Sequence, residues 1–242
     1  MSEKVLLVIQ LGQPPQGIAA QVGQQGEWFC DAVQGQGKTQ PVQVVRPDLG
    51  EPLPPFDAVA AVIITGSWSM VTDRLEWSEY TAGWLREAFH ADVPLLGVCY
   101  GHQLLADALG GKVGDNPNGK EVGVQVVTTN DAAAQDPLLR DFPPQFGAYL
   151  THQQSVLEAP EGAQVLASSQ MDGCQIIRYS DKVLTVQFHP EFNANIMCAC
   201  LRHNATALRQ DGYDVEQMMT IPQEPVWARK ILLDFVQRYA AK

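Results

Sequence analysis

The sequence predicts an α/β protein with a mostly parallel central sheet, helices on both of its faces, and a small antiparallel section. Two observations predict this class. Up to Gly110, short apolar runs alternate with segments of helical periodicity, which is the pattern of parallel strands joined by helical crossovers. After Gly111, strand-like segments follow one another closely without long helices between them, which favours antiparallel pairing.

The alternating half of the chain supplies the parallel layer. Its apolar runs predict strands at residues 5–11, 42–46, 58–65 and 94–98. Apolar residues at three- and four-residue spacing predict helices at 18–34, 75–90 and 101–109. The proline-rich stretches at 13–15 and 51–55 are predicted as loops between these elements.

The second half predicts the antiparallel section and the closing helices. Strand-like segments lie at 122–128, 164–167, 175–179 and 183–188. One helix is expected from near Asn193 to about Gly212. Another is expected from near Pro225, because proline suits the first turn of a helix. The residues expected on its core-facing side are Val226, Ile231, Leu232 and Phe235.

Length and charge limit the classes of function. A chain of 242 residues can bury a sizeable core, and we expect a single domain over residues 1–242. The net charge of −11 argues against nucleic acid or an anionic membrane as a partner, and no apolar run is long enough to span a bilayer. Five cysteines, an odd number, indicate free thiols and a cytoplasmic protein.

The segment Gly97-Val98-Cys99-Tyr100-Gly101 carries the strongest chemical signal. It follows a predicted strand and precedes a predicted helix, which is the arrangement of a nucleophile elbow with cysteine as the nucleophile. The glycines allow a sharp turn without a Cβ clash, and the N-terminus of the helix favours a thiolate. A merely structural cysteine would leave both glycines unexplained.

A candidate base follows a later strand. The apolar run at 183–188 leads directly to His189, and Glu191 lies two positions further on. Residues i and i+2 point to the same side of an extended chain, so the Glu191 carboxylate can hold the His189 ring and select its tautomer. Pro190 fixes φ between them and ends the strand. Without Cys99, a strand-end histidine beside a surface glutamate would be the simpler interpretation.

Together, GVCYGHQ at 97–103 and QFHPEF at 187–192 resemble the motifs of the class I glutamine amidotransferases, the Cys-His-Glu family. A third segment, VIITGSWS at 62–69, resembles the family's strand that ends in a glycine-containing oxyanion turn. The three segments occur in the family's order, over roughly residues 5–235. The chain is similar to stand-alone relatives of the glutaminase domain of GMP synthase. The resemblance implies a flavodoxin-like or Rossmann-like sheet.

The resemblance also implies a chemistry. Cys99 would attack the γ-amide of glutamine and form a γ-glutamyl thioester, with His189 as general base and acid and Glu191 as its orienting partner. The backbone N–H of Tyr100, which follows the nucleophile, would form part of the oxyanion hole. By resemblance, the second donor would be the backbone at Gly66 or Ser67.

Substrate contacts are also implied by the resemblance. The side chain of Gln103 and the backbone of Thr151, His152 and Gln153 would contact the substrate. One position departs from the family pattern, because Gln154 stands where the family commonly has an aspartate. Backbone contacts would survive this change, whereas a salt bridge to the substrate's α-amino group would not.

Three functions therefore remain open. The first is a glutaminase that releases glutamate and ammonia and serves a separate synthetase chain, since no Walker-type nucleotide-binding loop is present. The second is a stand-alone hydrolase of γ-glutamyl peptides or amides with the same thioester chemistry. The third is a non-catalytic binding or regulatory protein, against which the complete set of Cys99, His189 and Glu191 argues. Both enzyme functions imply a small-molecule substrate, no cofactor and no metal.

Overall fold

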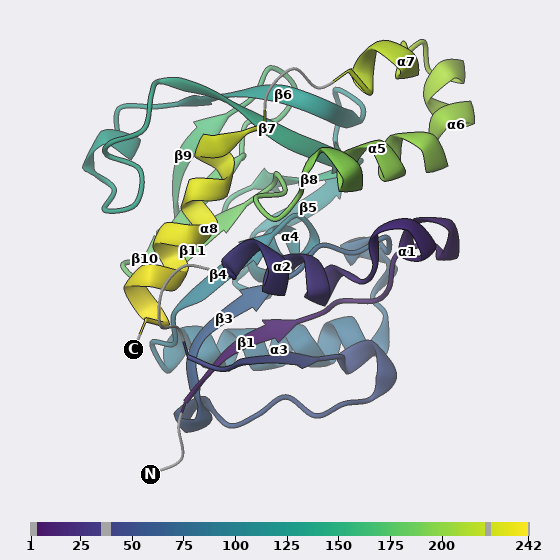
Figure 1. Cartoon of the computed structure of the whole chain (residues 1–242). Helices are drawn as coiled ribbons and strands as arrows, with labels where there is room; N and C mark the ends of the chain where they lie inside the picture. The colour runs from purple at the N-terminus through teal and green to yellow at the C-terminus, as the bar shows by residue number, and fades with distance from the viewer. Residues whose placement is uncertain (1–3, 35–39, 221–223, 242) are drawn as a thin grey trace.

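The computed structural model describes residues 4–34, 40–220 and 224–241, and it confirms the α/β class (Figure 1). Its main sheet has the strand order β2-β1-β3-β4-β11-β10-β9-β6-β7. These strands are β1 Val5–Ile9, β2 Val42–Val45, β3 Val59–Ile64, β4 Leu95–Val98, β6 Glu121–Thr129, β7 Gln145–His152, β9 Gln164–Ser168, β10 Ile176–Ser180 and β11 Val183–Val186.

The sheet changes from parallel to antiparallel at β11. From β2 through β1, β3 and β4 to β11, every neighbouring pair is parallel. From β11 through β10, β9 and β6 to β7, every pair is antiparallel. Two further strands, β5 (Lys112–Asp115) and β8 (Gln154–Glu158), form a separate antiparallel pair. The predicted division at Gly110 therefore separates parallel β1–β4 from a later section in which only β11 pairs in parallel.

Helices cover both faces of the sheet because side chains alternate along each strand. On β1, Leu6 and Val8 pack with residues of α2 and α8, whereas Leu7 and Ile9 pack with α3 and α4. Figure 1 shows α2 and α8 on one side of the sheet and α3 on the other. The helices are α1 Gln16–Val22, α2 Gln25–Val33, α3 Glu76–His90, α4 Tyr100–Ala108, α5 Ala194–His203, α6 Ala205–Gln210, α7 Val215–Met218 and α8 Val226–Tyr239.

The helix expected at 18–34 is two helices. Gly23 has a φ of 79°, a left-handed conformation that ends α1. A new helix then begins after Gln24, whose backbone N–H donates to Glu27 Oε2 at 2.7 Å in a capping arrangement. The single helix expected from Asn193 to Gly212 is likewise divided, at Asn204, into α5 and α6.

One core prediction is wrong. Val226 is 57% exposed. The buried stripe of α8 consists of Ala228, Ile231, Leu232, Phe235 and Val236, spaced three and four residues apart, and position 226 lies off this stripe.

The fold places the ends of three adjacent strands together. β3, β4 and β11 are parallel neighbours, so their carboxyl ends meet at one edge of the sheet. In open α/β sheets this edge is where ligands bind. None of the helices in residues 4–34, 40–220 and 224–241 is long and apolar enough to cross a membrane.

Candidate functional site

Cys99 occupies the turn between β4 and α4 in a strained conformation. Its φ of 52° and ψ of −103° are rare for a residue with a side chain, and such strain is typical of functional turns. The backbone N–H of Cys99 donates to Val186 O at 2.9 Å, and that of Gly101 donates to Thr65 O at 3.1 Å. Backbone bonds to β11 and β3 therefore hold the elbow.

The two glycines are required by close packing of the backbone. A Cβ at Gly97 would lie 2.7 Å from Gly101 O, and a Cβ at Gly101 would lie 2.5 Å from Ile64 O. Carbonyl oxygens of the backbone cannot move aside as a flexible side chain could. The geometry therefore supports the sequence-based explanation of these glycines.

His189 lies buried beside Cys99 and is held by Glu191. Glu191 Oε1 accepts a hydrogen bond from His189 Nδ1 at 2.8 Å, which leaves Nε2 as the ring nitrogen without a partner among the described residues. The backbone N–H of His189 donates to Tyr149 O at 2.9 Å, which ties the residue to β7. Phe192 stacks on the imidazole, with ring centroids 4.1 Å apart.

The charges around His189 set its protonation. Burial lowers the pKa of His189, but the negative charges of Glu191 and Cys99 outweigh burial and raise that pKa to about 10. The His189 imidazolium is therefore the dominant form at neutral pH. It faces an opposite charge at Cys99.

Gly66 brings the end of β3 against both side chains. A Cβ built at Gly66 would lie 2.9 Å from His189 Cε1 and 3.5 Å from Cys99 Cβ. The Gly66 carbonyl accepts hydrogen bonds from Gln25 Nε2 and Thr65 Oγ1, both at 2.9 Å. Because the peptide is planar and trans, the Ser67 N–H points opposite to that carbonyl. Gln25, which fixes this peptide, carries no motif that would reveal it in the sequence.

A cavity of about 230 Å³ opens at these residues. The side chains of Cys99 and His189 line it, whereas Glu191 lies behind His189 and does not. The other expected site residues that line it are Ser67, Tyr100, Gln103, Thr151, His152 and Gln153. The structure thus brings together at one cavity all of the expected residues except Gly66 and Glu191, which pack directly against His189.

Gln103 connects α4 to β8 and β11. Its Nε2 donates to Gln154 O at 2.6 Å and to Gln187 Oε1 at 2.9 Å. Tyr100 is anchored separately, since its hydroxyl bonds with Ser78 Oγ at 2.7 Å, and burial raises its pKa to about 12. The expected contribution of Tyr100 is its backbone N–H, which lies at the start of α4.

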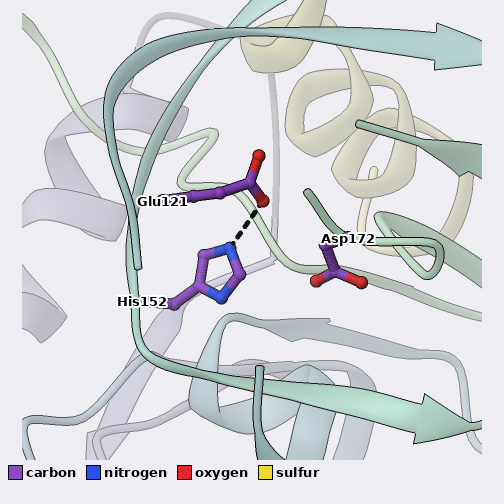
Figure 2. Close-up of side chains that lie close together, drawn as sticks. All are labelled: Glu121, His152 and Asp172. Carbon is purple, nitrogen blue, oxygen red and sulfur yellow. Dashed lines mark hydrogen bonds and ion pairs between the residues drawn. The ribbon is translucent and has the colours of Figure 1, made fainter. Parts of the chain in front are cut away.

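The side chain of His152 is engaged within the protein (Figure 2). Its Nε2 bonds with Glu121 Oε2 at 2.9 Å and its Nδ1 bonds with Gln154 O at 2.9 Å. Both partners are acceptors, so both ring nitrogens are used as donors. Gln175 Nε2 donates to the same Glu121 oxygen at 2.8 Å. A substrate would therefore meet His152 through its backbone, in agreement with the expectation from sequence.

The same cluster has the composition of a metal site but not its chemistry. Ligand atoms of Glu121, His152 and Asp172 lie within 4.8 Å of one another. A histidine binds a metal through a nitrogen lone pair, and both nitrogens of His152 are occupied as donors. The cluster is better described as a buried ion pair beside a carboxyl group. Burial raises the pKa of that carboxyl group, Asp172.

Gln154 directs its amide away from a role as an anion. Its Nε2 donates to Thr72 Oγ1 at 2.7 Å and to Asp115 Oδ1 at 3.2 Å. Among the described residues that line the cavity, none is an aspartate or a glutamate. An α-ammonium group would find only neutral acceptors there.

Comparisons with known proteins agree with this site. The family model for class-I glutamine amidotransferases matches residues 35–204. The glutamine-hydrolyzing subunit of GMP synthase from Halobacterium salinarum is 38% identical over 110 residues, which is 45% of this chain and 58% of that protein. Gamma-glutamyl peptidase 3 of Arabidopsis thaliana is 29% identical over 148 residues, 59% of this chain and 58% of that protein. The chain thus spans little more than half the length of these curated relatives.

A solved structure shows the same fold over the whole chain. The crystal structure of a glutamine amidotransferase from Thermotoga maritima superimposes with a TM-score of 0.79 at 20% identity, covering 99% of each chain. At this identity the likeness concerns the fold. The family match covers more than half of the chain and includes Gly66, Cys99 and His189. This chain belongs to the class-I glutamine amidotransferase family.

Proposed function

We propose that this protein hydrolyses the γ-amide of glutamine through a γ-glutamyl thioester on Cys99. The observation that carries the proposal is the convergence of Cys99 and His189 on the Gly66 turn, with Glu191 holding the far nitrogen of the imidazole. Nucleophile, proton carrier and orienting carboxylate all lie at the carboxyl ends of β4 and β11. The reaction needs no cofactor and no metal, and we treat residues 1–242 as one catalytic domain.

The first half-reaction forms the thioester. The Cys99 sulfur attacks the γ-carbonyl carbon, a C–S bond forms, and the carbonyl electrons move onto oxygen. The backbone N–H groups of Tyr100 and Ser67 are the proposed donors to this oxyanion, and each such donor is typically worth about 2.7–4 kcal/mol. The C–N bond then breaks, and the departing nitrogen takes the electron pair and a proton from His189 Nε2. The raised pKa of His189 keeps that proton in place at neutral pH.

The second half-reaction restores the enzyme. Water attacks the thioester carbon while His189 accepts the proton of the water. The C–S bond breaks, glutamate leaves, and the sulfur and imidazole return to their starting charges. Glu191 acts only by holding the ring and stabilising its positive charge.

Two further elements belong to the proposal. Because one relative is named as the glutamine-hydrolyzing part of a multi-subunit synthase, released ammonia would pass to a separate synthetase chain. We also place the protein in the cytoplasm, since all five cysteines are free thiols.

A second candidate is hydrolysis of γ-glutamyl peptides or amides. Two observations favour it: the cavity lining described here has no carboxylate to pair with an α-ammonium, and one relative is named a gamma-glutamyl peptidase. The chemistry at Cys99 would be unchanged, with an amine leaving in place of ammonia.

One assay tests the proposal. Purified protein without nucleotide or metal is incubated with glutamine and with γ-glutamyl dipeptides, and the release of glutamate is measured. Cys99→Ala should be inactive, whereas Cys30→Ala, on the outer part of α2 and away from the cavity, should be fully active. Release of glutamate by Cys99→Ala at the wild-type rate would refute the proposal.

A further inference from the structure

The aromatic wall beside His189 shows which leaving group the cavity suits. The argument rests on the proposed function, in which His189 Nε2 gives its proton to the departing nitrogen. That nitrogen must therefore lie on the His189 side of the scissile bond. Any substituent that it carries would continue along whatever surface adjoins the imidazole.

That surface is a continuous run of aromatic rings. Phe192 stacks on the His189 ring at 4.1 Å, Trp28 packs its edge against Phe192 at 5.6 Å, and Trp68 packs against Trp28 at 6.3 Å, measured between ring centroids. All three line the same cavity as Cys99 and His189. Phe192 and Trp28 are each 3% exposed, whereas Trp68 is only partly buried and forms the outer part of the wall.

The opposite elements extend this apolar surface. Leu208 of α6 and Val122 of β6 also line the cavity and belong to the same apolar cluster as Trp28 and Phe192. The cationic side chain at this part of the described lining is Lys120, and its Nζ lies 3.2 Å from Asp211 Oδ2 in a half-exposed pair. An ammonia molecule would use none of this surface.

We propose that the wall formed by Phe192, Trp28, Trp68 and Leu208 binds the substituent of the leaving amine. The preferred substrates are then γ-glutamyl conjugates of apolar or aromatic amines, including apolar amino acids. The step remains balanced: the C–N bond breaks, the amine nitrogen takes the electron pair and the His189 proton, and the amine leaves as R–NH₂. Glutamine is the smallest member of this series.

A graded substrate series tests the proposal on the wild-type protein. Glutamine, the γ-glutamyl methylamide, the γ-glutamyl isobutylamide and the γ-glutamyl benzylamide differ only in the leaving amine. We expect kcat/KM to rise along the three amides, by at least about tenfold from methylamide to benzylamide, since each added group buries apolar surface. A flat or falling series would overturn the inference.

Substitution of Trp68 tests the location of the wall. In Trp68→Ala the ratio of kcat/KM for benzylamide to that for methylamide should fall at least about fivefold. The matched control is Trp84→Ala, because Trp84 packs on the opposite face of the sheet near Pro54 and does not line the cavity. An unchanged ratio in Trp68→Ala would overturn the inference. If that variant does not fold, Leu208→Ala provides the same comparison.

The outcomes separate this inference from the function on which it rests. Failure of every compound to acylate Cys99 would refute the thioester function itself. Acylation by glutamine with no gain along the series would leave the function standing and refute the aromatic wall as a binding surface.

Discussion

Gly66 and His189 are in contact through the space that a side chain would fill. A Cβ at residue 66 would lie 2.9 Å from His189 Cε1, closer than such atoms approach in proteins. The backbone of Gly66 is not in the left-handed region, so the imidazole is the obstacle to a larger residue. Glycine at this position lets the turn after β3 approach the ring.

Gly66→Ala should therefore displace His189 and remove activity without unfolding the protein. Displacement of a reacting group by a fraction of an ångström can cost about 10²-fold in rate, and we expect a loss of that order in kcat/KM. The matched control is Gly83→Ala in α3, where a Cβ meets nothing within 4 Å. It should retain full activity and gain about 0.5–1 kcal/mol in the free energy of unfolding. Equal activity in both variants would contradict the packing described here.

Cys99 should be the cysteine that reacts at neutral pH. Burial raises the pKa of Cys174 to about 11 and that of Cys200 to about 12, so both remain protonated thiols at pH 7. A glutamine-like alkylating agent should label Cys99, as determined by peptide mass spectrometry. Cys174 should begin to react only as the pH approaches its raised pKa. Labelling mainly at Cys30, Cys174, Cys198 or Cys200 at pH 7 would show that the nucleophile is misassigned.

His189 and Cys99 should act as one unit. His189→Ala should lose nearly as much kcat/KM as Cys99→Ala, at least about 10²-fold, and the double variant should lose little more. Glu191→Gln should lose less, because its Oε1 can still accept from His189 Nδ1. His90→Ala, at the exposed end of α3, is the control and should be fully active. Additive losses in the double variant would argue against a shared step.

The buried pair of Glu121 and His152 should support the stability of the cavity wall. Removing one partner of a buried ion pair typically costs about 3–5 kcal/mol. We expect a loss in that range for Glu121→Gln in urea unfolding. Glu158→Gln breaks the exposed pair with Lys112 and should cost at most about 1 kcal/mol. Similar small losses in both variants would mean that Glu121 and His152 are not charged partners.

The sequence was sufficient for the fold class and for the meeting of the main site residues. Strand order follows from connectivity, and the motif after each strand therefore reaches the same sheet edge as its neighbours. Gly97 and Gly101 were interpretable because their spacing about Cys99 is typical of a sharp turn from strand to helix. The division of the first helix at Gly23 could not be inferred, since a glycine within a helical pattern is compatible with either outcome.

The contacts that support the site were not predictable. Gln25 lies 41 positions from Gly66, and Glu121 lies 31 positions from His152, so neither pair forms a local pattern. The aromatic wall joins Trp28, Trp68 and Phe192 from three separate segments. Strands β5, β7 and β8 were missed because their apolar residues are interrupted by polar and glycine positions.

The most direct test of the account is detection of the thioester. Protein is mixed with glutamine or a γ-glutamyl benzylamide, quenched in acid within the first turnover, and analysed by mass spectrometry of the peptide containing Cys99. We predict a γ-glutamyl adduct on Cys99 that disappears in Cys99→Ala and accumulates if hydrolysis is slower than acylation. Glutamate release without any adduct on Cys99, or no adduct from either substrate on a thiol shown to be reduced and alkylatable, would contradict the account.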